Sequence, residues 1–173
     1  TEEKIREMKK KLRIPLEKHI VLFCSSHKLQ TTILTLIAKS IIISNSKPYL
    51  IIKLHPVITE KYKYSNHMES FDSYSYKFID SKIDNLILCS DLVISELSNV
   101  AYESVICNKP HLILSRDVDL KDGPGFIETP TIMSSKDLHQ TATLIDKMIL
   151  DSDFKDRFGQ ARIPFLKKYF YNI

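Results

Sequence analysis

Short apolar runs that alternate with segments of helical length are the feature that most constrains this chain. Four runs rich in Val, Ile, Leu and Phe are bounded by polar residues, as is typical of strands buried on both faces of a parallel sheet. They cover residues 19–24, 49–54, 91–94 and 111–114. Helical segments separate them, so the pattern predicts an α/β domain: a Rossmann-like, three-layer fold with a mostly parallel sheet and helices on both faces.

The other segments complete a single domain over residues 1–173. Helices are expected over residues 1–12, 28–43, 100–107, 136–150 and 151–173, a short edge strand over 76–79, and one or two helical turns over 82–89. Residues 57–74 predict a short helix and a loop, and residues 122–125 (Asp-Gly-Pro-Gly) predict a loop. Ser134 and Ser135 are suited to cap the helix that follows them.

Composition excludes several classes of protein. Of the 173 residues, 43% are apolar and 27% are charged, which suits one domain with a hydrophobic core. Only three glycines occur, and no glycine-rich dinucleotide fingerprint is present. A net charge of +4 suits a phosphate ligand or equally a solvated lysine-rich surface. This modest charge argues against nucleic-acid binding, and the tyrosines at 62, 64, 74 and 76 are better explained as loop aromatics than as a stacking platform.

The cysteines and the chain ends bear on location. Cys24, Cys89 and Cys107 match no zinc spacing and lie beside apolar runs, so we expect core thiols in a reducing cytoplasm and no metal site. No apolar run reaches membrane-spanning length, and the charged start is unlike a signal peptide. The first residue is not Met, so we expect a piece of a longer protein, cytoplasmic or peripheral at the inner face of the membrane.

Polar residues follow three of the predicted strands. They are Ser25-Ser26-His27, His55-Pro56 and residues 95–99 (Ser-Glu-Leu-Ser-Asn). Because ligands of open parallel sheets bind beyond the carboxyl ends of the strands, these groups are expected to converge on one site.

Residues 95–99 lead straight into a predicted helix. Free N–H groups at a helix start bind phosphate, and the side chains of Ser98 and Asn99 offer further hydrogen bonds; plain N-capping is the alternative. Glu103, one turn later, is placed to accept hydrogen bonds from ribose hydroxyls, or else is an exposed helix residue. His55 is placed to contact a phosphate or a base, or else is an ordinary polar residue at a strand end.

Together these motifs resemble a known family. Residues 53–56 (Lys-Leu-His-Pro), residues 91–99, Glu103 and Lys109-Pro110, at this spacing, are similar to the C-terminal domain of GT-B glycosyltransferases. The nearest resemblance is to CDP-glycerol glycerophosphotransferases of teichoic acid synthesis and to capsule-polysaccharide transferases. It covers roughly residues 8–150.

The resemblance implies roles for individual residues and segments of the chain. His55, Ser95, Ser98, Asn99, Ser25 and Ser26 would line the phosphate site of a CDP-, CMP- or UDP-activated donor, and Glu103 would hold the ribose. Residues 1–14 would be a linker helix and 151–173 a C-terminal helical segment. The catalytic base and the site for a polysaccharide or lipid-linked acceptor would lie in a missing N-terminal domain, so we expect no catalytic residue here, no metal and no cofactor.

The sequence differs from the family pattern at two positions, and three alternative assignments are considered. Leu97 stands where an aromatic residue is usual, and Arg116 is the only match for an expected basic residue. The same cleft would also suit a UDP-N-acetylglucosamine 2-epimerase-like half-domain, or an inactive α/β interaction module. A receiver-type signalling domain is discounted, because Cys24-Ser25-Ser26 stands where that fold needs acidic residues.

Overall fold

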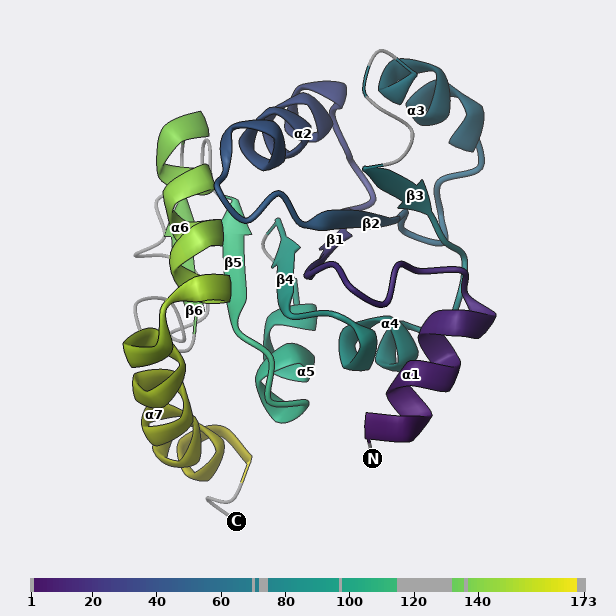
Figure 1. Ribbon diagram of the computed structural model, residues 1–173. Coiled ribbons are helices and arrows are strands. Elements are labelled where there is room, and N and C mark those ends of the chain that lie inside the picture. Colours follow the sequence, from purple (N-terminus) through teal and green to yellow (C-terminus); the bar gives the residue numbers. More distant parts are fainter. Residues whose placement is uncertain are drawn as a thin grey trace.

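The chain folds around one six-stranded parallel sheet (Figure 1). The computed structural model describes residues 2–69, 71, 75–96, 98–114, 132–135 and 137–170. The strands are β1 (Ile20–Cys24), β2 (Tyr49–Lys53), β3 (Tyr76–Phe78), β4 (Leu92–Ser95), β5 (His111–Leu114) and β6 (Ile132–Ser135). Their order is β3-β2-β1-β4-β5-β6, and every neighbouring pair is parallel.

This order places a change of direction at the centre of the sheet. From β1 the chain moves outward through β2 to β3, and from β4 it moves the other way through β5 to β6. β1 and β4 are neighbours, with Cys24 opposite Ser95 at their carboxyl ends. The loops that leave these two ends diverge, and such a point is where open α/β sheets bind ligands.

Helices cover both faces of the sheet. They are α1 (Glu2–Lys11), α2 (Thr31–Ile43), α3 (Lys61–Met68), α4 (Ile83–Cys89), α5 (Val100–Ile106), α6 (Leu138–Leu150) and α7 (Ser152–Phe170). Figure 1 shows α2 and α3 on one side of the strands and α1, α4 and α5 on the other, with α6 beside α2. The long α7 joins the two sides: Phe154 and Phe158 belong to the core cluster of α2 and α6, whereas Phe165 packs with α5.

The apolar runs are uniform because each strand is buried on both faces. In β1, Val21 and Phe23 enter the core beneath α2, whereas Ile20 and Leu22 enter the core shared with α1 and α4. All four are fully buried. Burial of each such side chain contributes about 1.5–3 kcal/mol, so the two apolar layers on the strands supply the main stabilisation of the domain.

The structure confirms the predicted α/β fold with helices on both faces, and it corrects one local prediction. Ser134 and Ser135 do not cap α6; they end β6, a strand that the sequence pattern did not predict. The cap is Asp137, whose side chain accepts a hydrogen bond from the N–H of Gln140 at 2.9 Å. The predicted loop at residues 122–125, and Arg116 with it, lie outside the described residues.

Cys24 and Cys89 are buried and Cys107 is half-buried, and all three are free thiols. Burial raises the pKa of the Cys24 thiol to about 12, so this group is a neutral part of the core, as the sequence indicated. Within the described residues, no helix is both long enough and apolar enough to span a bilayer. The same part of the chain holds no cluster of His, Cys, Asp and Glu suited to a metal ion.

Candidate functional site

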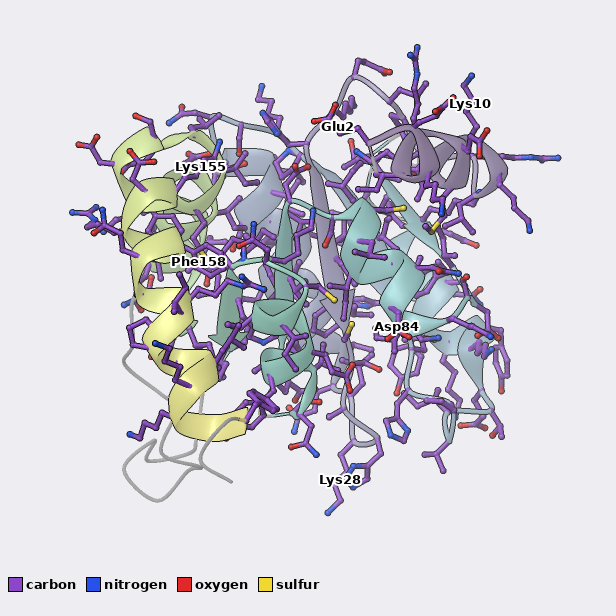
Figure 2. All side chains as sticks on the ribbon, turned by 90° about the horizontal axis from the view of Figure 1, so that it is seen from below. Glu2, Lys10, Lys28, Asp84, Lys155 and Phe158 are labelled. Carbon is purple, nitrogen blue, oxygen red and sulfur yellow. The ribbon has the colours of Figure 1, made fainter. Side chains whose placement is uncertain are left out.

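The loops after β1 and β4 part at the carboxyl edge of the sheet, and the place where they part is called the gap. The first loop leads to α2 on one face and the second to α5 on the other, so they separate where the strands end. Figure 2 shows Lys28 projecting from the loop after β1, at the end of the molecule opposite Lys10 of α1. This edge therefore forms one end of the domain.

Ser25 ties the end of β1 to the end of β2. Its N–H donates to the carbonyl of Lys53 at 3.0 Å, and its Oγ accepts from the N–H of His55 at 2.8 Å. The side chain of Ser25 is buried, whereas His55 is exposed. Ser25 and His55 are thus brought together as expected, with Ser25 as the structural partner.

The imidazole of His55 is oriented by its own loop. Nδ1 accepts from the N–H of Val57 at 3.2 Å, and the ring stands edge-on to His27 with 6.1 Å between the ring centroids. Because Nδ1 is an acceptor, the neutral ring carries its proton on Nε2. The exposed side chain therefore presents a hydrogen-bond donor beside the gap.

A hydrogen bond joins the loops that follow the neighbouring strands β1 and β4. The N–H of Ser26 donates to Oε2 of Glu96 at 3.1 Å. Glu96 belongs to the polar loop predicted at residues 95–99, but it was not among the predicted site residues. The feature that could have indicated a role for Glu96 is its position directly after β4. The end of β1 lies opposite, but this is known only once β1 and β4 are known to be neighbours.

Ser98 and Asn99 lie at the start of α5. Oγ of Ser98 accepts a long hydrogen bond, 3.4 Å, from the N–H of Val100, and the Asn99 side chain caps nothing. Within the described part of the chain, the N–H groups of Ser98 and Asn99 have no hydrogen-bond partner. Capping alone therefore leaves donors at this position unused.

Ser95 is placed differently from the other predicted site residues. It is fully buried, and its Oγ donates to the carbonyl of Glu96 at 2.5 Å and contacts Nε2 of His111 at 2.9 Å. This hydroxyl is engaged between β4, β5 and the following loop. The structure therefore separates Ser95 from the side chains that border the gap.

Glu103 has one oxygen that is buried and unpaired. Within the described residues, Oε2 has no hydrogen-bond partner. Burial raises the pKa of this carboxyl group, and the negative charge of Asp84 on the neighbouring α4 raises it further. Figure 2 shows Asp84 on the face of the sheet that also carries α5. An acceptor left unpaired in a folded protein is costly and calls for a partner.

A cavity of about 270 Å³ continues this edge beyond β2 and β3. Its apolar part is formed by Ile52, Leu54, Phe78 and Ile79, and its polar part by Lys61, Ser65 and Asp80. Oδ2 of Asp80 is 2.9 Å from Nζ of Lys61, and Oδ1 is 3.6 Å from Nζ of Lys53. The hydrogen bond from Lys61, with the charges of both lysines, lowers the pKa of Asp80. Two ammonium groups share one carboxylate, so this flank carries a net positive charge.

Comparison with known proteins finds one family model and several relatives that match the chain. A family model described as CDP-Glycerol:Poly(glycerophosphate) glycerophosphotransferase matches residues 1–172. The teichoic acid glycerol-phosphate primase of Bacillus spizizenii is 28% identical over 121 residues, which cover 68% of this chain and 30% of the primase. The chain thus spans about a third of that relative.

Solved structures show the same fold. A variant of the wall teichoic acid polymerase TagF, soaked with CDPG, superposes with a TM-score of 0.67 at 16% identity, covering 95% of this chain and 40% of the polymerase chain. The C-terminal CMP-Kdo binding domain of WaaA from Acinetobacter baumannii superposes with a TM-score of 0.65 at 12% identity, covering 95% of this chain and 97% of that domain.

Proposed function

Because the chain belongs to the CDP-glycerol:poly(glycerophosphate) glycerophosphotransferase family, we propose that it is the nucleotide-donor-binding half of a glycerophospho- or glycosyltransferase of surface polysaccharide synthesis. The observation that carries the proposal is the joining of three strand ends around the gap between β1 and β4. The hydrogen bonds from His55 to Ser25 and from Ser26 to Glu96 make that connection.

The gap offers donors where a diphosphate would lie. The N–H groups of Ser98 and Asn99 open α5, and His55, which follows β2, carries an exposed Nε2–H. Backbone N–H groups and a neutral imidazole donor suit phosphate oxygens. When the bond between the transferred group and the nucleotide breaks, the departing phosphate gains negative charge, and donors already held in place stabilise that charge.

Glu103 would hold the sugar of the nucleotide. A carboxylate oxygen that is buried yet unpaired gains a partner when a ribose hydroxyl donates to it. Such a bond is available to CDP, CMP and UDP alike, since all three carry ribose. Glu103 therefore contributes affinity for the ribose, while the choice of base depends on other contacts.

The rest of the reaction needs parts outside this chain. We propose that a further domain supplies the catalytic base and binds a polysaccharide or lipid-linked acceptor, and that the chain alone binds nucleotide weakly without turnover. The matched relative is about three times longer than the matched segment, which supports this arrangement. An intracellular CDP- or UDP-activated donor and a membrane-linked acceptor would place the whole enzyme at the inner face of the membrane.

Titration of the ¹⁵N-labelled chain with CDP, CMP and UDP, followed by amide NMR, tests the proposal. The amides of Ser26, His55, Ser98 and Asn99 should shift in a saturable way, while His19 and Asp91 at the opposite edge should not. If no amide at the gap shifts at millimolar nucleotide, the proposal is wrong, and the alternative of an inactive interaction module is favoured.

A further inference from the structure

His111 lies at the centre of a buried polar network beneath α5. The ring is fully buried, as are Ser95 and Ser104. Nε2 is 2.9 Å from Oγ of Ser95, and Nδ1 is 3.0 Å from Oγ of Ser104. Each serine also contacts a backbone carbonyl: Ser95 that of Glu96 at 2.5 Å, and Ser104 that of Ala101 at 2.8 Å. The network therefore links β5, β4, α5 and the loop that borders the gap.

This network has fewer protons available for hydrogen bonding than it has hydrogen-bond contacts. A neutral imidazole and two hydroxyls supply three protons, one each, for the four contacts just described. An imidazolium would supply a fourth proton, but burial lowers the pKa of His111 to about 3. The ring is thus neutral, and one of the four contacts has no proton.

The backbone decides which contact is left without a proton. The carbonyl of Ala101 lies inside α5, where it accepts the N–H of the residue four positions later by the helical pattern. The carbonyl of Glu96 lies in a loop and has no such helical donor. Ser95 therefore gives its proton to Glu96, so Nε2 must be the protonated nitrogen, and Ser104 donates to Nδ1.

We propose that His111 is a positioning residue of the nucleotide site: as its Nε2–H tautomer it holds Ser95, and through Ser95 it fixes the backbone of Glu96 from which the loop to α5 departs. With this carbonyl held, the Glu96 carboxylate reaches across to the N–H of Ser26, and the loop delivers Ser98 and Asn99 to the gap. The role in binding rests on the proposed function; the tautomer and the anchoring of the loop do not.

The tautomer is tested directly by NMR of ¹⁵N-histidine-labelled protein. Long-range ¹H–¹⁵N correlations should show His111 with Nε2 protonated and Nδ1 unprotonated, unchanged from about pH 5 to about pH 8. A ring protonated on Nδ1 instead, or one that titrates in this range, would overturn the proposal.

Two substitutions that each replace the imidazole with a carboxamide distinguish a positioning role of His111 from mere packing. His111→Gln puts an amide near the former Nε2 and keeps a donor for Ser95, whereas His111→Asn puts its amide near the former Nδ1 and keeps only the Ser104 contact. Both lose ring volume and one hydrogen bond. We expect the Gln variant to bind nucleotide within about threefold of the parent chain, and the Asn variant to bind about tenfold more weakly, as for one lost hydrogen bond.

A buried serine outside the network is the matched control. Ser90, at the opposite edge, is buried and donates to the carbonyl of Ile87 at 2.8 Å. Ser95→Ala should reproduce the Asn variant, whereas Ser90→Ala should leave nucleotide affinity unchanged. Equal affinities for the Gln and Asn variants would show that His111 only fills space.

A readout without nucleotide keeps this inference separate from the proposed function. The Ser26 amide reports on Glu96 because it donates to that carboxylate. Its hydrogen exchange should accelerate in His111→Asn and in Ser95→Ala but not in His111→Gln. If the parent chain binds no nucleotide yet exchange follows this order, the donor-binding proposal fails while His111 still anchors the loop; if exchange is the same in all variants, the positioning role is wrong.

Discussion

The two edges of the sheet use polar side chains in opposite ways. At the amino edge, charged side chains are engaged in hydrogen bonds to the backbone. Oδ2 of Asp91 accepts from the N–H of Ile20 at 2.7 Å, and the Asp146 carboxylate accepts from the N–H groups of Asn45 and Ser46, both at 2.8 Å. Arg162 of α7 donates in the same way to the carbonyls at the end of α5.

At the carboxyl edge, polar groups join loops and keep bonding capacity. Glu96 reaches from one loop to another, His55 stays exposed, and Oε2 of Glu103 has no partner among the described residues. An unpaired buried acceptor weakens the fold. The amino edge is thus built for stability, whereas the carboxyl edge gives up some stability to keep groups available for a ligand.

Glu103→Gln should produce the largest effect on nucleotide affinity, and it should act at the carboxyl edge alone. The lost charge-assisted bond to ribose should weaken nucleotide binding by about 1.5–3 kcal/mol, roughly 10- to 150-fold, as measured by calorimetric titration. Since the folded-state pKa of Glu103 is raised, the parent chain loses stability as pH rises from the unfolded value through the folded one.

Glu103→Gln removes that loss, so at neutral pH the variant should unfold at the same temperature as the parent chain or a higher one. A variant that melts clearly lower would mean that Glu103 has a structural partner, and the contrast between the two edges would then fail at this residue.

Arg162→Met should act at the amino edge alone. The guanidinium donates to the carbonyls of Val105 and Ile106 at 2.7 Å each, and methionine keeps an apolar stem without these bonds. We expect a loss of about 1–2 kcal/mol in the free energy of unfolding, measured with urea, and unchanged nucleotide affinity. A parallel drop in affinity would show that the two edges are coupled through α5.

Asp146→Asn should give a smaller effect that depends on pH. Burial acts to raise the pKa of Asp146, but hydrogen bonds from Ser46 and Asn45 outweigh it and lower the pKa below its ordinary value. The carboxylate therefore stabilises the fold above the unfolded pKa, and this contribution disappears as pH falls through the lower folded value.

The expected cost of Asp146→Asn is about 1 kcal/mol near neutral pH, with the two urea curves converging in acid. A difference that stays constant down to the acid limit would rule out the ionised carboxylate as the cause.

Local pattern was enough for most elements of the fold. Runs such as residues 49–54 are apolar throughout because parallel strands bury both faces, and this signal is present in the sequence. β6 escaped prediction because its last residues are Ser134 and Ser135, whose polarity suggested a helix cap. Only pairing with β5 makes them a strand, with Leu114 opposite Ser135.

Site residues were predictable as positions but not as roles. Ser25, Ser26 and His55 were selected because they follow strands, and they do lie together. Ser95 was selected by the same rule, yet its hydroxyl is held by His111, sixteen residues later. Glu96 was not predicted as a site residue because nothing in the sequence around it indicates a hydrogen bond with Ser26, seventy residues earlier.

The sequence by itself determined the α/β class, the buried strands and the edge of the sheet where polar groups gather, because periodicity and burial are local consequences of side-chain chemistry. Only the tertiary structure decided which hydroxyl faces the gap, which is held beneath α5, and which carboxylate remains unpaired. These outcomes depend on the order of β1, β4 and β5 in the sheet, since hydrogen-bond partners are chosen by proximity in space and not by distance along the chain.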